Sequence, residues 1–231
     1  MDNSSPDSLP ALCGYVTRHE SWKIAGQMFD LTWPADIDAL LDSPDTHQRF
    51  KKDEYMPYWA VPWPSSVHLA RKVLKTPAGE GRKAVEIGCG VGLVSVAAAM
   101  MGWSVWASDY DPVAVQYAQH NARANGVELA TAEPLDYRER LLAPRFHLIL
   151  GSDLLYERRC AQPVAAWICS ALLPEGEAWL SDPNRSAADD FPDIARRQGL
   201  QVDVEQTETA EPAGLISRAR IWRLRWPDSA R

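Results

Sequence analysis

From residue 83 onward, short apolar runs alternate with segments of helical periodicity. The run Phe146–Ser152 is almost continuously apolar, which is typical of a strand covered on both faces of a sheet. The segment 112–125 has instead the apolar spacing of a helix, with proline in its first turn and Asn125-Gly126 as its stop signal. The pattern predicts strands over residues 83–88, 104–109, 127–130, 146–152, 177–181, 200–205 and 218–226. It predicts helices from about residue 65 to 75 and over residues 92–101, 112–125, 161–173 and 187–198.

This order of elements indicates an α/β fold. Strands alternate with helices, and the chain closes with two strands, 200–205 and 218–226, in which apolar and polar residues alternate with period two. We therefore predict a doubly wound, mostly parallel, seven-stranded Rossmann-like sheet with an antiparallel C-terminal edge strand.

The N-terminal part of the chain does not follow this pattern. We divide the chain into a short N-terminal extension, residues 1–54, and a main domain, residues 55–231. Within the extension, residues 15–31 around Ala25-Gly26 predict a short hairpin. The segment that follows, up to Pro64, is expected to be a loop rich in charged and aromatic residues. Three prolines within residues 57–64 are incompatible with a regular helix or a central strand there.

Composition narrows the possible functions. The 231 residues include 24 Lys and Arg against 31 Asp and Glu, a net charge of −7, which argues against binding to nucleic acid or an anionic membrane and is compatible with a basic partner. No apolar run reaches the ~18–20 residues of a membrane-spanning helix, and the first ten residues lack the basic start of a signal peptide. The four cysteines form no C-x-x-C pair, so we expect no metal site, no disulfide and a cytoplasmic location.

A glycine-rich loop marks the candidate ligand site. The strand at residues 83–88 runs into E-I-G-C-G-V-G, Glu86 to Gly92, and then into a helix, so backbone N–H groups at the helix start can face a ligand. Asp109 closes the next strand, 21 residues after Gly88, where a carboxylate can accept hydrogen bonds from both hydroxyls of a ribose. The spacing indicates a ligand that contains a nucleoside. In the alternative, the glycines serve only the turn.

The loop favours S-adenosylmethionine over a dinucleotide. The dinucleotide pattern G-x-G-x-x-G would place a third glycine at position 93, which is Leu93 here. Glu86 adds a carboxylate at the loop, which suits a ligand with an ammonium group and little phosphate charge. S-adenosylmethionine has an ammonium group, a ribose, an adenine and no phosphate, and an NAD-dependent oxidoreductase is the distant alternative.

Four motifs carry a resemblance to a known family. They are E-x-G-x-G-x-G (86–92), S-D-Y-D-P (108–112), N-A-R-A-N-G (121–126) and G-S-D-L-L-Y (151–156). Together they resemble the class I, seven-β-strand S-adenosylmethionine-dependent methyltransferases. The aromatic-proline segment 57–64 and D-x-x-Y at 153–156 are similar to the protein-lysine methyltransferase branch, methyltransferase family 16, with enzymes that act on electron-transfer flavoprotein. The resemblance covers residues 55–185.

The resemblance implies which residues bind S-adenosylmethionine and its product S-adenosylhomocysteine. The expected set is Glu86, Gly88 and Gly90 at the methionine half, Asp109 at the ribose, Tyr110 and Asp136 at the adenine, Trp63 as a cover, and Ser152 through its backbone. For two of these residues a structural role is the alternative. Asp136 would then cap a helix, and Trp63 would only pack within the proline-rich loop.

Asp153 and Tyr156 are the expected catalytic residues. Asp153 follows the fourth strand, and doubly wound sheets bind ligands at the carboxyl ends of their strands. Because the glycine loop, Asp109 and the third-strand loop already meet the cofactor, the Asp153 carboxylate is expected to be free to orient the ammonium group of a methyl acceptor. Tyr156 would form a wall of the acceptor channel. In the alternative, Asp153 caps the following helix and Tyr156 only packs.

We therefore expect a methyltransferase that acts on a lysine amine of a protein partner. The alternatives are an N-methyltransferase of a small amine or metabolite and, outside the enzymes, a protein that binds S-adenosylmethionine as a sensor or scaffold. The glycine motif and D-x-x-Y favour an active enzyme. The segment Asp182 to Arg185, after the fifth strand, borders the same cleft without an assigned role.

Overall fold

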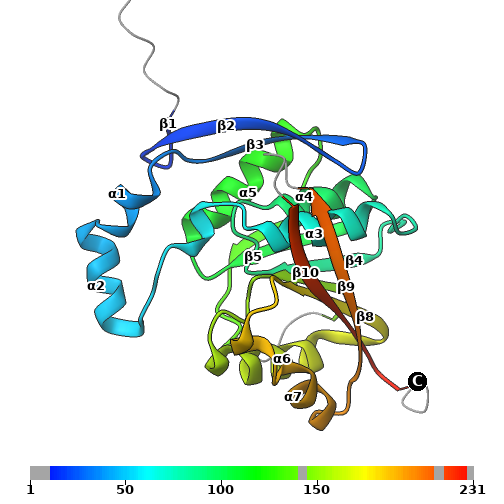
Figure 1. Ribbon diagram of the computed structural model, residues 1–231. Helices are drawn as coiled ribbons and strands as arrows, with labels where there is room; N and C mark the ends of the chain where they lie inside the picture. The colour runs from blue at the N-terminus through cyan, green and yellow to red at the C-terminus, as the bar shows by residue number, and fades with distance from the viewer. Residues whose placement is uncertain (1–10, 140–144, 211–215, 228–231) are drawn as a thin grey trace, which may run out of the picture.

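The fold is built on a central sheet that helices cover on both faces (Figure 1). The computed structural model describes residues 11–139, 145–210 and 216–227. The strands are β1 (Ala11–Leu12), β2 (Tyr15–Ile24), β3 (Gln27–Pro34), β4 (Lys83–Ile87), β5 (Ser104–Asp109), β6 (Thr131–Pro134), β7 (Phe146–Ser152), β8 (Leu172–Asp182), β9 (Gln201–Ala210) and β10 (Ile216–Arg225). The α-helices are α1 (Ile37–Leu41), α2 (Pro44–Asp53), α3 (Pro64–Leu74), α4 (Leu93–Met100), α5 (Pro112–Ala124), α6 (Ala161–Ala171) and α7 (Phe191–Arg197).

The main sheet is doubly wound and mostly parallel, as the sequence predicts. Its strand order is β6-β5-β4-β7-β8-β10-β9. The strands from β6 to β8 pair in parallel, and β10 and β9 close one edge in antiparallel pairing. The direction of winding reverses between β4 and β7, and ligands bind at such a switch point, outside the carboxyl ends of the strands. This topology places the candidate site just after Ile87 and Ser152.

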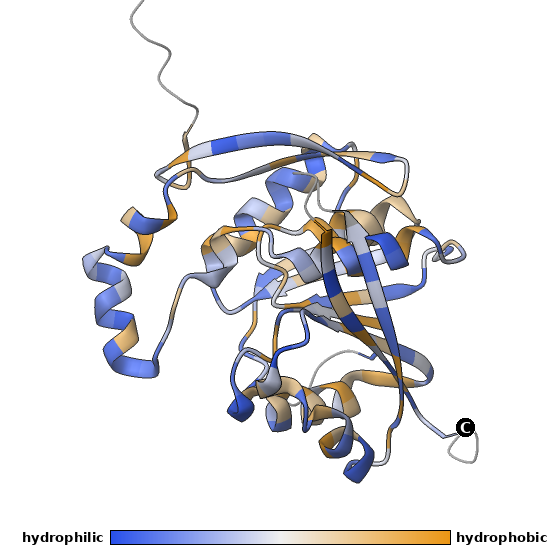
Figure 2. Cartoon of the chain, viewed as in Figure 1, coloured by the Kyte–Doolittle hydropathy of each residue, from blue (hydrophilic) through white to orange (hydrophobic). Residues whose placement is uncertain are grey.

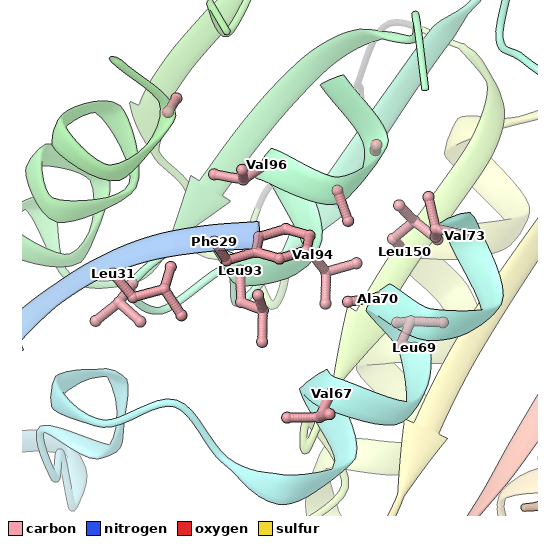
Figure 3. Close-up of a cluster of buried hydrophobic side chains, with 14 of the residues drawn as sticks. Phe29, Leu31, Val67, Leu69, Ala70, Val73, Leu93, Val94, Val96 and Leu150 are labelled. Carbon is pink, nitrogen blue, oxygen red and sulfur yellow. The ribbon is translucent and has the colours of Figure 1, made fainter. Parts of the chain in front are cut away.

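Each face of the sheet has its own apolar core. Helices α3, α4 and α5 cover one face, where Phe29 of β3 lies among Leu93 and Val94 of α4 (Figure 3). Helices α6 and α7 cover the other face, with Trp167 and Phe191 among the largest buried side chains. Because β3 supplies Phe29 to the same cluster as α3 and α4, the N-terminal extension shares a core with the rest of the chain.

The hairpin predicted within the extension consists of β2 and β3, which pair in antiparallel register. Ala25 and Gly26 at its tip have φ angles of 49° and 91°, the left-handed conformations of a type I′ turn. The outer strand β2 is mostly hydrophilic, whereas β3 turns Phe29 and Leu31 toward the core (Figure 2). The hairpin therefore covers α4 and α5 with one apolar face.

Two short helices, α1 and α2, stand where the sequence indicates a loop. Each begins at a side-chain cap: Asp36 accepts the N–H of Ala39 at 2.9 Å, and Ser43 accepts the N–H of Thr46 at 3.2 Å. Most of α2 is hydrophilic (Figure 2), so it lacks the apolar stripe by which a helix is recognised in a sequence. The expectation of a loop is therefore wrong for residues 37–53.

The strand predicted over residues 127–130 is also wrong, because β6 begins four residues later. After α5 ends, the N–H of Val127 bonds to the carbonyl of Ala122 at 3.0 Å around Gly126, whose φ is 69°. Val127 and Leu129 then pack against the core, as apolar residues after a helix C-terminus often do. Their alternation with polar neighbours imitates a strand.

The other predicted elements are present with shifted ends. Strand β8 begins five residues before its predicted start, because pairing of Leu172 with Phe146 extends it. The helix predicted over residues 187–198 is divided into a 3₁₀ turn, Ser186–Ala188, and α7. Pro192 occupies the first turn of α7 and sets the start of that helix.

Two asparagines, Asn121 of α5 and Asn125 at the C-cap of this helix, attach the hairpin to the main sheet domain. Asn121 accepts the N–H of Thr32 at 2.8 Å and donates to its carbonyl at 2.9 Å. Asn125 bonds to Asp30 in the same way, at 2.9 and 2.7 Å. The Asn121 amide also donates to the carbonyl of Val91 in the glycine loop at 2.8 Å. The two side chains thus satisfy the edge of β3 as a neighbouring strand would.

Candidate functional site

A cavity of about 490 Å³ opens at the carboxyl ends of β4, β5 and β7, and this volume is within the range of small-molecule sites. Every residue that the sequence singles out lines this cavity: Trp63, Glu86, Gly88, Gly90, Asp109, Tyr110, Asp136, Ser152, Asp153 and Tyr156. Residues that are far apart in the sequence therefore meet at the switch point of the sheet.

The glycine loop after β4 depends on backbone conformations that favour glycine. Gly90 has a φ of 52°, and its N–H donates to Asp109 Oδ2 at 2.9 Å. Gly92 has a φ of 87°, and a Cβ at this position would lie 2.7 Å from the Cα of Ala118 in α5. The loop therefore packs directly on α5 while its backbone borders the cavity.

Glu86 is a buried acid of the cavity wall. Only 1% of its surface is exposed, and Ser95 of α4 donates a hydrogen bond to its carboxyl group. Burial raises the pKa of Glu86 to about 8. Its carboxyl group is therefore mostly protonated at neutral pH in the ligand-free protein, and a cationic ligand group would favour the ionised form.

Asp109 ends β5 with both carboxylate oxygens bonded to backbone groups. Oδ2 accepts the N–H of Gly90, and Oδ1 accepts the N–H of Asp111, both at 2.9 Å. Burial raises the pKa of Asp109 to about 6, although these hydrogen bonds oppose the shift. Each oxygen has a further lone pair for a ligand hydroxyl.

Tyr110 and Asp136 meet in the cavity wall through Arg138. The Arg138 guanidinium forms a two-pronged ion pair with Asp136, with Nη2 at 2.7 Å from Oδ2, and its centre lies 5.0 Å from the centre of the Tyr110 ring. Asp136 also accepts the N–H of Arg138 at 2.9 Å. The Tyr110 hydroxyl donates to Asp53 at the end of α2. The N-terminal extension therefore contributes Asp53 to this wall, which the sequence does not indicate.

The extension also supports the loop that follows β5. Asp111 caps α5 by accepting the N–H of Val113 at 2.7 Å, and its carboxylate lies 2.8 Å from the guanidinium of Arg49 in α2. The Tyr55 hydroxyl donates to the same carboxylate and accepts a hydrogen bond from Trp59 Nε1 at 3.1 Å. Asp111 is almost fully buried, so it depends on these partners.

Replacing Asp111 with alanine should lower the free energy of unfolding by about 3 kcal/mol, because the change removes a helix cap and the shared partner of Arg49 and Tyr55. Urea unfolding measures the loss. Asp203→Ala, at a strand position whose side chain is 60% exposed, is the matched control and should change the free energy by less than about 0.5 kcal/mol. Equal stability of both variants would show that the Asp111 contacts contribute nothing.

Asp153 follows β7 with a φ of 59°, which is uncommon for a residue other than glycine. Its N–H donates to the carbonyl of Ser181 at 3.0 Å. The sequence predicts a free carboxylate here, and this prediction is wrong: Ser65 of α3 donates to Oδ2, and Arg185 Nη2 lies 2.7 Å from Oδ1. Burial raises the pKa of Asp153, and both partners oppose the shift. Asp153 is not the cap of α6, which begins at Ala161 without a side-chain cap.

Three aromatic rings in contact border the cavity. Tyr58 lies between Trp63 and Tyr156, with ring centres 6.1 and 5.3 Å apart. Trp63 Nε1 donates to the carbonyl of Tyr58 at 2.6 Å, which holds the aromatic-proline segment in place. Tyr58 is 42% exposed and Tyr156 is 43% exposed, so a partner can reach both. Burial of its hydroxyl raises the pKa of Tyr156, so this group is a hydrogen-bond donor at neutral pH.

Sequence reasoning assigns no role to Tyr58 or Arg185, although it places the segment 182–185 at the cleft and both residues line the cavity. Tyr58 belongs to the aromatic-proline segment, in which only Trp63 is assigned a role. Arg185 follows β8, whose carboxyl end lies beside that of β7 in the parallel pair. Its position just after a central parallel strand is the signal that could have identified it.

The charges of the cavity wall suit a ligand with an ammonium group better than one with phosphates. In the described part of the chain the arginines of this wall are ion-paired: Arg138 with Asp136, Arg159 with Glu54 and Glu157, and Arg185 with Asp153 and Asp182. A phosphate would therefore have to compete with carboxylates for each guanidinium. Glu86 and Asp109 can instead meet an ammonium group and hydroxyl groups.

Residues 11–139, 145–210 and 216–227 contain no group of three or more His, Cys, Asp or Glu side chains that could hold a metal ion. The four cysteines, all within these ranges, are free thiols. Among the described helices, none has the length and apolar character needed to cross a bilayer.

Comparison with known sequences identifies methyltransferases that are similar to this chain. The family model for ribosomal protein L11 methyltransferase (PrmA) matches residues 67–148, which include the glycine loop and Asp109. The electron transfer flavoprotein beta subunit lysine methyltransferase of Xenopus laevis is 30% identical over 174 residues, 72% of this chain and 68% of that protein. The protein of the same name from Danio rerio is 31% identical over 178 residues, 72% of this chain and 66% of its own length.

Comparison with solved structures supports the same fold. The ribosomal protein L11 methylase from Lactobacillus delbrueckii subsp. bulgaricus superposes with a TM-score of 0.57 at 18% identity, covering 72% of this chain and 81% of that chain. At this identity the likeness concerns the doubly wound architecture alone.

Proposed function

Because this chain belongs to the class I S-adenosylmethionine-dependent methyltransferases, in the family of the electron transfer flavoprotein beta subunit lysine methyltransferases, we propose that it methylates a lysine side chain of a protein partner. The observation that carries the proposal is the cavity, whose wall brings Glu86 and Asp109 together with Asp153 and the exposed ring of Tyr156. A carboxylate beside aromatic rings suits the ammonium group of a lysine.

Glu86 and Asp109 would hold the methionine and ribose parts of the cofactor. When bound, S-adenosylmethionine supplies a methyl group on a positively charged sulfur, and the bond from sulfur to that carbon breaks as the acceptor nitrogen bonds to the carbon. Glu86 would meet the ammonium group of the cofactor, where low exposure strengthens the attraction. Asp109 would accept hydrogen bonds from the ribose hydroxyls, and Gly88 and Gly90 would let the backbone approach the ligand.

The adenine would lie against the wall formed by Tyr110 and Asp136. Arg138 fixes the Asp136 carboxylate, whose remaining lone pairs can accept a hydrogen bond from the adenine amino group. Trp63 would cover the cofactor, because an aromatic face attracts a cation such as a sulfonium. Ser152 would add a contact through its backbone.

Asp153 and Tyr156 would receive the acceptor amine. The Asp153 carboxylate can attract and orient a lysine ammonium group, and the rings of Tyr156 and Tyr58 can flank the apolar stem of the lysine side chain. The ammonium group must lose a proton to water before its nitrogen can react. Positioning of the amine and exclusion of water would supply most of the acceleration.

The proposed partner is a protein with an accessible lysine. The relatives carry the electron transfer flavoprotein beta subunit in their names, so this subunit is the first acceptor to test. The net charge of −7 supports attraction to a basic surface at low ionic strength. The four free thiols support a reducing compartment such as the cytoplasm.

Methyl-tritiated S-adenosylmethionine tests this function directly. The protein is incubated with purified electron transfer flavoprotein beta subunit or with a cell extract, and protein-bound label is separated from small molecules. We expect label in protein, with mass spectrometry locating the methyl group on lysine. Label in small molecules alone would identify a small-amine methyltransferase, and cofactor binding without any transfer would indicate a sensor or scaffold.

Thermal melting should distinguish the cofactor from a dinucleotide. S-adenosylhomocysteine at about 100 times its Kd should stabilise the protein by about 2.7 kcal/mol, whereas NAD should leave Tm unchanged. Asp109→Ala should remove most of this stabilisation because it removes the acceptor of the ribose hydroxyls, and Asp203→Ala should retain it. A shift with NAD and none with S-adenosylhomocysteine would contradict the assignment of the cavity.

A further inference from the structure

Arg185 lies beside Asp153, and contacts with Asp182 hold it in place. Its Nη2 is 2.7 Å from Asp153 Oδ1, and its Nη1 is 3.3 Å from Asp182 Oδ2. The backbone N–H of Arg185 also donates to Asp182 Oδ1 at 2.7 Å. Because Asp182 is fully buried, its charge requires these partners.

Arg220 of β10 continues this line of charges toward the surface. Its Nη2 is 3.3 Å from Asp182 Oδ1 and also donates to the carbonyl of Arg185. Its Nη1 is 2.7 Å from Asp189 Oδ1. Acids and bases alternate from the cavity outward in the order Asp153, Arg185, Asp182, Arg220, Asp189. If Arg185 turned into solvent, Asp153 would lose its paired cation and Asp182 would keep only Arg220.

The backbone on both sides of this contact is left-handed. Asp153 has a φ of 59° and Asn184 has a φ of 64°, conformations that among residues with a Cβ are adopted mainly by Asn and Asp. The strands that precede them are parallel neighbours, with Ser152 opposite Ser181. Such conformations persist where the surrounding contacts require them and are concentrated at functional sites. Here they accompany two side chains, Asp153 and Arg185, that border the same cavity.

We propose that Arg185 is a positioning residue for the methyl acceptor. Arg185 fixes the Asp153 carboxylate at the cavity and offsets its negative charge, so that this carboxylate stabilises the ammonium form of an incoming amine less strongly. This inference rests on the proposed lysine methylation. It assigns a role to the D-P-N-R segment at the end of β8, whose arginine is paired with Asp153 and Asp182.

The reason lies in the proton that the acceptor must lose. A lysine amine has a pKa of ~10.4 in water, and a lone carboxylate beside it would favour the charged form further. A guanidinium that shares the carboxylate opposes this effect. The polar and charged groups around Asp153 are Ser65 from α3, Asp182 and Arg185 from β8 and its loop, Arg220 from β10, and, after β7, Tyr156 with its neighbours Arg138 and Glu157. Of the cations in this group, Arg185 is the one paired directly with Asp153.

The pH profile of transfer tests this role. Methyl transfer from tritiated S-adenosylmethionine to the electron transfer flavoprotein beta subunit, or to the extract protein that the parent labels, is followed between about pH 6 and pH 10. In Arg185→Gln the rising limb of kcat, which reports groups in the bound complex, should move upward by about one pH unit, which lowers transfer at pH 7 about tenfold and restores it at higher pH. Arg185→Lys retains a positive charge and should keep the parent profile at a lower maximal rate.

A second measurement does not depend on turnover. In urea unfolding, Arg185→Gln should lower the midpoint of the parent protein. In the Asp153→Asn background the same change should lower the midpoint less, because residue 153 then carries no charge with which Arg185 could pair. S-adenosylhomocysteine should bind Arg185→Gln within a few-fold of its affinity for the parent.

An unchanged pH profile in Arg185→Gln, equal midpoint shifts in the two backgrounds, or loss of cofactor binding would each overturn the role of Arg185. Absence of lysine labelling by the parent itself would overturn the proposed function and this role together. The two failures are distinguishable, because the first is confined to the variants and the second is seen with the unmodified chain.

Discussion

A Glu86→Gln variant should bind S-adenosylmethionine about a hundredfold more weakly than the parent protein. Glutamine keeps the size of the side chain and can accept the hydrogen bond from Ser95, but it carries no charge. Removing one partner of a buried charge pair costs ~2–5 kcal/mol, and Glu86 is 1% exposed. Isothermal titration calorimetry measures the change. Glu128→Gln, at an exposed acid outside the cavity, is the matched control and should bind as the parent does.

The proton on Glu86 gives this prediction a pH dependence. Burial raises the pKa of Glu86 to about 8 in the ligand-free protein, from an ordinary value of 4.5. A bound ammonium group would lower it again, so binding near pH 7 should release about one proton, which titration in buffers of different ionisation enthalpy detects. Between these two pKa values the folded chain holds a proton that the unfolded chain does not. The free energy of unfolding should therefore fall as the pH rises through this window, and less so in Glu86→Gln.

Equal affinities of the parent and Glu86→Gln for S-adenosylmethionine would mean that the ammonium group of the ligand binds elsewhere. Equal proton release by both proteins would assign the proton to another group, of which Asp109 is the first to test because burial also raises its pKa, to about 6.

An Asp153→Asn variant should lose methyl transfer by about a hundredfold or more while its affinity for S-adenosylhomocysteine stays within a few-fold of the parent's. The carboxylate is the charged group that would orient the acceptor amine, and the amide that replaces it has no net charge. The Asp153 carboxylate contacts Ser65 and Arg185, whereas the carboxyl groups of Glu86 and Asp109 have other partners, so the expected cofactor residues keep their own contacts. Label transfer and calorimetry on the same preparation separate the two effects.

Asp203→Asn, at an exposed position of β9, is the matched control for Asp153→Asn and should transfer label at the parent's rate. Loss of cofactor binding in Asp153→Asn would place Asp153 among the cofactor-binding residues. Transfer at the parent's rate would leave the D-x-x-Y motif with a structural role.

Most of the central sheet is predictable because its strands, apart from β6, carry a local signal. The continuous apolar run of β7 reflects burial on both faces, and the glycine loop after β4 and Asp109 after β5 mark carboxyl ends that a parallel sheet brings together. The third strand is misplaced because Val127 and Leu129 alternate as a strand would but pack behind the end of a helix. Local pattern cannot distinguish these two uses of an apolar residue.

The rest of the site depends on contacts between distant residues. Tyr110 bonds to Asp53 across 57 positions, and Ser65 bonds to Asp153 across 88. No periodicity or motif predicts such a pair, because each partner is an ordinary polar residue in its own segment. The pairing of Arg185 with Asp153 is of the same kind, since it requires β7 and β8 to be neighbours and both following turns to be left-handed.

The side-chain amides of Asn121 and Asn125 set the alignment of the N-terminal hairpin along α5. Four residues of an α-helix rise about 6.0 Å and two residues of a strand about 6.8 Å, so one amide meets each second residue of β3. A slip by two residues would preserve the apolar face of the hairpin but leave an amide without its strand partner, so the asparagines define an alignment that hydrophobicity alone leaves open. Because Asn121 also holds the carbonyl of Val91, the placement of the glycine loop depends on that alignment. A slip of β3 along α5 would therefore also change the contacts that hold the glycine loop.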